Sequence, residues 1–183
     1  ITIRFSRQDS ETHQNSHTFY LAYEGPLPTM SQAKEIKVDV TIKERMVEKP
    51  KDLVVLTSYP EYTDLPHGVS VLGYSLTEMA MEKTVALLDR ARTEPRDLYD
   101  LWFLTDQEKR VDLRDCLNGV QSKLEHRGKK LEEVCGEFAN KEARLKKTWE
   151  PRLSPQMSRL PEFEGVYRSV KRNLRHAKIT VES

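Results

Sequence analysis

The spacing of apolar residues changes at Ser75, and this change limits the fold class that the chain can adopt. Before Ser75, short runs rich in β-branched and aromatic residues are separated by turn-forming breaks. These runs cover residues 1–7, 18–23, 36–43, 53–59 and 69–74. After Ser75, apolar residues recur at helical spacing. The sequence therefore predicts an α+β protein, with a β-rich part over residues 1–76 and a helical region over residues 77–183.

The run 36–43 shows the strand pattern most clearly. Ile36, Val38 and Val40 alternate there with Lys37 and Asp39. Successive side chains of a strand point to opposite sides of the sheet. We therefore predict that one face of this strand is buried and that the other is polar.

Start and stop signals divide the remaining sequence into helices. Ser75 followed by Glu78 is a capping-box pattern, which predicts a first helix that ends near Arg92. Pro95 suits the opening turn of a second helix, which we expect to end near Thr105. Apolar spacing predicts further helices over 113–126, 131–147 and 162–177, and the prolines at 151, 155 and 161 predict a loop.

The net charge of +1 hides an uneven distribution of charge along the chain. Residues 1–106 carry a net charge of −5, and residues 107–183 carry a net charge of +6. This excess favours a polyanionic partner for the carboxyl-terminal part, such as a nucleic acid. Solvated helix faces also produce such an excess, so both interpretations remain open.

Several protein classes do not fit the sequence. No apolar run approaches the length of a membrane span, and the amino terminus does not resemble a signal peptide. Cys116 and Cys135 lie far apart in helical sequence, which favours a reducing cytoplasm over a disulfide framework. The histidines lack the spacing of zinc ligands, and P-loop, dinucleotide-binding and hydrolase-elbow motifs are missing.

Lys83 is the first candidate for chemistry because it falls among apolar residues on its predicted helix. The arc around it contains Met79, Ala86 and Leu87. A cation there costs several kcal/mol unless an anion or a cavity compensates its charge. Arg90 follows seven residues later on the same predicted face, so the two cations suit neighbouring phosphates. Alternatively, Lys83 reaches water past its neighbours and Arg90 pairs with a surface carboxylate.

Three acidic residues are the next candidates. Asp97 and Asp100 share one face of the second helix, beside Arg96, and converging carboxylates bind a cation or take up protons. Alternatively, Asp97 favours the start of the helix and Asp100 pairs with Arg96. Asp39, on the polar face of its strand, either reaches a metal across the sheet or simply faces solvent.

Two segments of the helical region resemble one known family. They are Glu-Lys-Thr-Val-Ala-Leu-Leu-Asp-Arg at 82–90 and Pro-Arg-Asp-Leu-Tyr-Asp-Leu at 95–101. This pair resembles the paired carboxyl-side motifs of the AbiEii/AbiGii toxins, the nucleotidyltransferase-like toxins of type IV toxin–antitoxin systems. The resemblance covers about 36–104. It implies a partial mixed β-sheet of the polymerase-β-like nucleotidyltransferase fold, followed by helices.

The resemblance also implies an activity and a set of site residues. The expected reaction transfers a nucleotide from a nucleoside triphosphate (NTP) to RNA, often the 3′ end of tRNA, with Mg²⁺. Lys83 would hold the triphosphate and Asp97 would be its essential acidic partner. Arg90 would bind substrate, whereas Asp39 would stand at a third, strand-borne carboxylate position. The pocket would be shaped by Arg96, Tyr99 and Asp100. A cognate antitoxin is the expected protein partner.

One family motif is missing from the sequence. A Gly-Ser turn followed by an Asp-x-Asp strand, whose aspartates would hold the metal ions, does not occur in the 183 residues. Because the chain opens at Ile1 in a strand-like run, we expect this segment to lie upstream rather than to have been lost. We also expect the 183 residues to be inactive on their own.

A non-enzymatic alternative comes from the last predicted helix. Its apolar face is opposite a basic face, which consists of Arg168, Lys171, Arg172, Arg175 and Lys178. Such a face suits RNA phosphates or an acidic antitoxin. The helical region would then be a binding module without catalysis.

Overall fold

The computed structural model describes residues 4–12, 16–24, 34–41, 44–56 and 68–181. Contacts divide the chain into two compact units, Ile1–Arg45 and Met46–Ser183. Each unit is described by itself below. The change from strands to helices at Ser75 falls inside the second unit.

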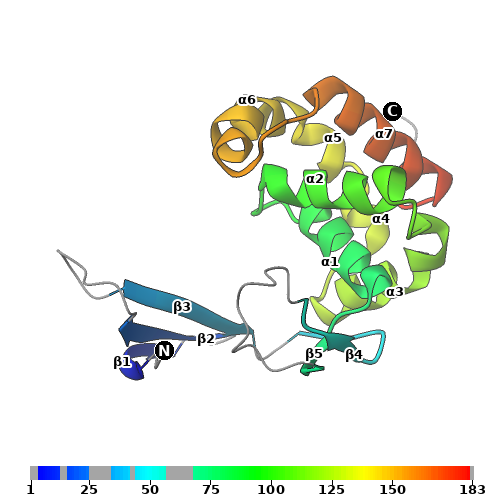
Figure 1. The fold of residues 1–183 in the computed structure, drawn as a ribbon. Helices are drawn as coiled ribbons and strands as arrows, with labels where there is room; N and C mark the ends of the chain where they lie inside the picture. Colours follow the sequence, from blue (N-terminus) through cyan, green and yellow to red (C-terminus); the bar gives the residue numbers. More distant parts are fainter. Residues whose placement is uncertain (1–3, 13–15, 25–33, 42–43, 57–67, 182–183) are drawn as a thin grey trace. The chain divides into compact units, whose positions relative to one another are not determined.

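The first unit contains a three-stranded antiparallel sheet (Figure 1). Its strands are β1 (Arg4–Thr12), β2 (Ser16–Glu24) and β3 (Lys34–Thr41), in the order β1-β2-β3. The pairing of β1 with β2 shifts register between Arg7 and Asp9, as at a β-bulge. A strand over most of the run 36–43 is therefore confirmed, while residues 42 and 43 lie outside the described residues.

The predicted burial of one face of β3 is wrong. Ile36 is 43% exposed and Val40 is 41% exposed, although both lie on the face that we expected to be covered. The described part of this unit contains only strands, so it supplies no second layer that would cover this face. The alternating pattern identified the strand but could not supply the layer that would cover it.

The second unit opens with a two-stranded antiparallel sheet. β4 (Lys51–Val54) pairs with β5 (Ser70–Gly73), and residues 57–67 between them lie outside the described residues. The α+β class is thus confirmed. The mixed sheet is not observed, because all the described strands pair antiparallel and form two separate sheets.

Helices make up the rest of the second unit (Figure 1). The long ones are α1 (Leu76–Leu88), α2 (Pro95–Trp102), α3 (Leu113–His126), α6 (Glu142–Leu153) and α7 (Phe163–His176). The short ones are a π-helical turn η1 (Phe103–Gln107), α4 (Leu131–Val134), α5 (Glu137–Asn140) and a 3₁₀ turn η2 (Ser154–Gln156). None of the described helices is long and apolar enough to cross a membrane.

Two helix predictions need correction. The single helix expected over 131–147 is broken into α4, α5 and the start of α6, and Gly136 lies at the first break. Glycine has a low helix propensity, which explains the interruption. The expected proline loop is partly helical, because Pro151 lies near the end of α6 and Pro155 lies in η2. The helices predicted over 113–126 and 162–177 are confirmed.

The hydrophobic core lies in the helical part of the second unit, where α1 packs against both α2 and α3. Met81, Val85 and Leu88 of α1 are buried, as are Leu98 and Leu101 of α2. A second layer comes from α6 and α7, whose apolar faces join the same core. Because α1 and α2 are fixed by this core on one side, the polar residues on their other faces have defined positions.

The start of α1 is held by its cap and by the chain before β4. The Ser75 hydroxyl accepts a hydrogen bond from the Glu78 backbone N–H at 3.0 Å, as predicted. In a capping box the Glu78 carboxylate would bind the backbone N–H of Ser75. It accepts hydrogen bonds from the backbone N–H groups of Val47 and Glu48 instead, at 3.2 and 3.0 Å. Lys123 of α3 lies 2.6 Å from the same carboxylate. Glu78 therefore connects α1 to two other segments.

Candidate functional site

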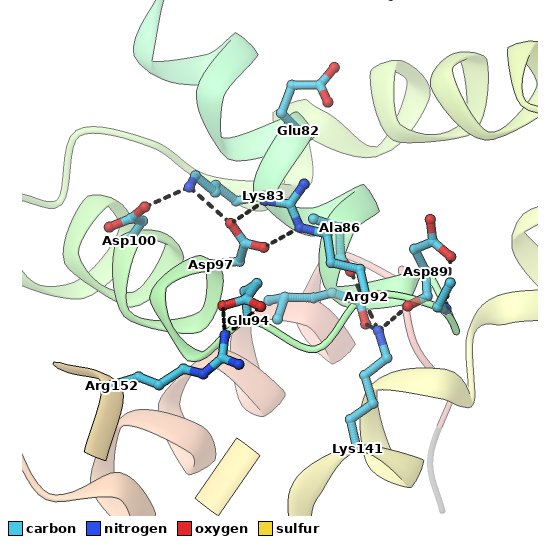
Figure 2. Close-up of polar contacts among 12 residues, drawn as sticks. Glu82, Lys83, Ala86, Asp89, Arg92, Glu94, Asp97, Asp100, Lys141 and Arg152 are labelled. Atoms are coloured by element: carbon cyan, nitrogen blue, oxygen red, sulfur yellow. Dashed lines mark hydrogen bonds and ion pairs between the residues drawn. The ribbon is translucent and has the colours of Figure 1, made fainter. Parts of the chain in front are cut away.

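Lys83 lies at the centre of a polar cluster formed by α1 and α2 (Figure 2). Its amine is 2.9 Å from Asp97 Oδ1 and 2.6 Å from Asp100 Oδ2. Asp97 belongs to the first turn of α2, which Pro95 opens. Asp100 follows one turn later, so both carboxylates face α1 from the same side of α2. The expected contact of Lys83 with these two aspartates is therefore present in the structure.

Asp97 is the buried centre of this cluster. Its side chain is 1% exposed, and it contacts cations from two different segments. Arg92 donates from Nε to Asp97 Oδ2 at 2.8 Å and from an Nη atom to Oδ1 at 3.2 Å. A buried carboxylate is stable only when it is paired, and Asp97 is paired twice.

Sequence reasoning missed Arg92. It lies between α1 and α2, outside any periodic pattern, and was expected only as the end of the first helix. One signal pointed to it: a basic residue in a short connection, five positions before a buried aspartate. The connection turns the chain back, and this turn places the guanidinium of Arg92 against α2.

Lys83 keeps its proton because the aspartates outweigh its burial. Desolvation, the largest single influence, lowers the pKa of the amine, but the hydrogen bonds that the amine donates to Asp100 and Asp97, together with their negative charges, raise it by more. The pKa of Lys83 is therefore above its ordinary value. An ammonium group has three N–H donors, and the two aspartates use two of them. One donor is left for a ligand.

The two cations can be reached from solvent. The side chain of Lys83 is 23% exposed and that of Arg92 is 49% exposed, whereas Asp97 between them is closed to water. A guanidinium group has five N–H donors, and Arg92 uses two of them on Asp97. The cluster thus presents unused donors of fixed cations to the surface. Asp97 and Asp100 balance the charges of the two cations, so an anionic ligand such as phosphate would be held by these unused donors rather than by an excess of positive charge.

Lys141 fixes the connection between α1 and α2 from the opposite side (Figure 2). Its side chain is nearly fully buried, and its amine donates to the carbonyl oxygens of Ala86, Leu87 and Asp89. The first two distances are 3.4 and 2.8 Å. Burial lowers the pKa of Lys141 to about 8. These carbonyls end α1, so Lys141 holds the point from which the chain turns towards Arg92.

The second helix is held at its start by α6. Arg152 of α6 donates to both carboxylate oxygens of Glu94, at 2.7 and 2.6 Å. Glu94 precedes Pro95 and is the N-cap residue of α2. The first turn of α2, which carries Asp97, is therefore tied to two other helices, by Lys83 to α1 and by Glu94 to α6.

The remaining predicted residues of this region lie in different surroundings. Arg90 does not share a helix face with Lys83, because α1 ends at Leu88 and Arg90 lies exposed in the following turn. That part of the prediction is wrong. Arg96 is exposed on α2. Tyr99 packs in an aromatic group with Trp102 and Trp149, at ring-centre distances of 5.7 and 6.4 Å.

Asp39 lies in the first unit, on β3. Its carboxylate accepts a hydrogen bond from Thr18 at 2.6 Å and lies 3.3 Å from the Lys37 amine. Among the described residues, no group of three or more His, Cys, Asp or Glu residues is placed to hold a metal ion. In the cluster itself, both oxygens of Asp97 accept hydrogen bonds from cations. The described residues therefore do not fit Mg²⁺.

The basic face predicted for the last helix is present on α7. Arg168, Arg172 and Arg175 are exposed, and Lys171 is half-buried. One of these, Arg172, lies 3.6 Å from Asp106 Oδ1. The opposite face of α7 is buried, as predicted.

Comparison with family models gives one match. The model described as "Nucleotidyl transferase AbiEii toxin, Type IV TA system" matches residues 2–170. This match includes both units and reaches into α7. Comparisons with curated proteins and with solved structures find no match.

Proposed function

Because the chain belongs to the AbiEii family of nucleotidyltransferase toxins of type IV toxin–antitoxin systems, we propose that the Lys83 cluster binds the triphosphate of a nucleotide that is transferred to RNA. The observation that supports this role is the pairing of two solvent-accessible cations on one buried carboxylate. Lys83 and Arg92 are held by Asp97, which is itself closed to water.

The cluster would act by positioning charge. In phosphoryl and nucleotidyl transfer, negative charge develops on phosphate oxygens, and fixed donors stabilise it without having to reorganise. Lys83 has one free N–H donor and Arg92 has three, and Asp97 limits the movement of both side chains. Asp97 is then a positioning residue. Asp100 shares the Lys83 amine, and the exposed Arg90 and Arg96 follow the cluster's residues closely in the sequence and would add positive charge for the substrate.

The family and the chemistry together suggest the other components. The donor is an NTP, and the acceptor is RNA, with the 3′ end of tRNA as our choice. A cognate antitoxin is implied by the type IV system. These components place the reaction in the cytoplasm. The family reaction uses Mg²⁺, whose ligands would come from an Asp-x-Asp motif that these 183 residues do not contain. No step is assigned to the metal here.

Transfer can be tested in a protein that carries this chain together with the Asp-x-Asp segment of the family. Incubated with labelled NTPs, Mg²⁺ and tRNA, it should label the RNA, whereas the 183 residues alone should not. Lys83→Ala should abolish labelling. Lys147→Ala, which removes an exposed lysine of α6, should retain it. Undiminished labelling by Lys83→Ala would refute the role given to Lys83.

The exposed arginines of α7 support a second candidate, a binding module without catalysis. In that case Arg172→Glu and Arg175→Glu should abolish RNA binding, while Lys83→Ala has no effect on any RNA-dependent property. A salt titration separates the two candidates, because the loss of phosphate contacts flattens the dependence of affinity on salt.

A further inference from the structure

A cavity lies where the end of η1, the start of α3 and the last turn of α7 meet, and it includes no residue of the Lys83 cluster. Its volume is about 840 Å³. Four basic side chains line it: Lys109, Arg110, Arg114 and His176. Two acidic side chains, Asp112 and Asp115, also line it. None of the charged groups in this cavity belongs to the proposed triphosphate site.

The charges in the cavity are not balanced. Arg114 pairs with Asp112, with an Nη–Oδ2 distance of 2.5 Å, so these two charges cancel. Within the described residues, no hydrogen bond or ion pair engages the side chains of Lys109, Arg110 or His176. Asp115 is the remaining acid. Two permanent cations therefore face one anion, and both cations have all their donors unused.

The backbone at Lys109 adds an independent observation. Lys109 has a φ of 50°, in the left-handed region. Its neighbours close the helix end, with Glu108 N–H bonded to Phe103 O at 2.9 Å and Arg110 N–H bonded to Leu104 O at 3.0 Å. Glycine is the favoured residue at such a position, because a side chain there is strained. Lys109 therefore stands where glycine would be less strained, and its unpaired amine lines the cavity.

The lining favours phosphate over other ligands. None of the described lining residues is Phe, Tyr or Trp, so the cavity offers no stacking platform for a base. Its only aliphatic lining residues, Val111 and Leu113, are buried, so it lacks the exposed apolar centre of a protein interface. Exposed cations with free donors are the usual contacts to a nucleic-acid backbone, which position the strand without reading its sequence.

We propose that this cavity binds the phosphodiester backbone of the RNA acceptor, through Lys109 and Arg110. The proposal rests on the proposed function, because it assigns that function's RNA substrate a place on the protein. The cavity then differs in role from the Lys83 cluster, since one site holds the acceptor and the other holds the donor nucleotide.

The test measures binding of a fluorescein-labelled RNA stem–loop to the 183-residue chain by anisotropy, at several salt concentrations. Lys109→Gly and Arg110→Gln should each weaken binding roughly 3- to 8-fold and lower the slope of log affinity against log salt by about one. Lys109→Gly should at the same time raise the denaturation midpoint, because it relieves the left-handed strain. Loss of binding in a more stable variant cannot come from misfolding.

One further test variant, Asp115→Asn, and two control variants complete the experiment. Lys178→Gly is the control for Lys109→Gly, and Glu132→Gln is the control for Asp115→Asn. Lys178 has a φ of 58° at the end of α7 and is not among the lining residues, so Lys178→Gly should raise stability with a smaller loss of affinity. Asp115→Asn removes the unpaired anion of the cavity and should tighten binding roughly 3-fold, from the Coulomb energy at about 6 Å in water. Glu132→Gln, at an exposed position in the first turn of α4, should change nothing.

Four outcomes would overturn the proposal, three in the binding experiment and one in the labelling experiment. Wild-type affinity in Lys109→Gly and Arg110→Gln is one, and equal losses in Lys109→Gly and Lys178→Gly are another. The third is competition by free NTP: if NTP displaces the RNA, and if Lys109→Gly weakens NTP binding as much as RNA binding, the cavity is a nucleotide site. Failure of the proposed function gives a different result. RNA that binds through the cavity but is never labelled by NTP would contradict nucleotide transfer and leave this inference intact. Labelling of RNA that the cavity variants do not reduce would contradict this inference and leave nucleotide transfer intact.

Discussion

At the scale of single residues, the site depends on one buried carboxylate. Asp97 is closed to water and accepts hydrogen bonds from both Lys83 and Arg92. Because Asp97 is buried, its negative charge is costly unless cations pair with it. Among the described residues, no other carboxylate binds both Lys83 and Arg92. Within the part of the chain that the structure describes, the Asp100 carboxylate is paired only with Lys83, and it is about one-third exposed. The two aspartates therefore differ in what their loss would cost.

This difference predicts unequal effects of matched substitutions. Asp97→Asn should lower the free energy of unfolding by roughly 2 to 3 kcal/mol, less than for a fully buried ion pair because Lys83 and Arg92 can rehydrate. Asp100→Asn should cost under about 1 kcal/mol, as expected for a partly exposed pair. Denaturant titration of both variants measures the difference. Equal losses would show that Asp97 is not the anchor of the cluster.

At the scale of elements, the decisive feature is the connection between α1 and α2. The starts of both helices were predicted, since the Ser75 cap and the Pro95 opening are observed, but α1 ends at Leu88 rather than near Arg92 and α2 ends at Trp102 rather than near Thr105. The connection was not predicted, because Arg92 and Lys141 act through long-range contacts that leave no local period. Lys141 in particular comes from the break between α5 and α6, a region where a continuous helix was expected. Local patterns identified the helices, and tertiary packing determined the polar contacts between them.

Burial of Lys141 predicts a pH effect on stability. In the folded chain its pKa is about 8, against an ordinary value of 10.5. Between these values the unfolded chain binds more protons, so the contribution of Lys141 to stability rises with pH across this window. The free energy of unfolding of the wild type minus that of Lys141→Met should therefore increase by about 1 kcal/mol per pH unit from pH 8.5 to 9.5.

Measuring the difference between the two proteins removes other titrating groups. Burial raises the pKa of Cys116 to about 12, which makes stability fall above pH 9, but this effect is the same in both proteins. Chemical denaturation at four or five pH values is sufficient. A difference that stays constant or shrinks as the pH rises would mean that Lys141 is not held as a desolvated cation.

At the scale of the whole molecule, the main hydrophobic cluster of the described residues belongs to the second unit. All buried core residues of the cluster lie between Ala80 and Ile179. The sequence predicted the class and most helices of this unit, because periodicity and caps are local signals. The division after residue 76 stays a prediction, while contacts group residues 46–76 with the helices. The reason is Glu78, whose carboxylate binds backbone N–H groups thirty residues earlier.

Truncation tests where the unit begins. A chain of residues 46–183 retains the Ser75 cap and the Glu78 contacts, whereas a chain of residues 77–183 loses both. The shorter chain should be less stable by roughly 2 to 4 kcal/mol, from the lost cap and the lost backbone hydrogen bonds to the Glu78 carboxylate, which keeps only its ion pair with Lys123. Thermal and denaturant unfolding of the two chains compare them directly. Equal stability would favour the division after residue 76 that the sequence suggests.

The most direct test of the central claim is calorimetric titration of tripolyphosphate, a ligand without a base, into the 183-residue chain in the absence of divalent cations. If Lys83 donates to a triphosphate, Lys83→Met should weaken binding roughly 10- to 100-fold, as expected for one charge-assisted hydrogen bond. Lys147→Met should bind as the wild type does. Wild-type affinity in Lys83→Met would contradict the account, because the cluster would then be a structural ion pair between two helices.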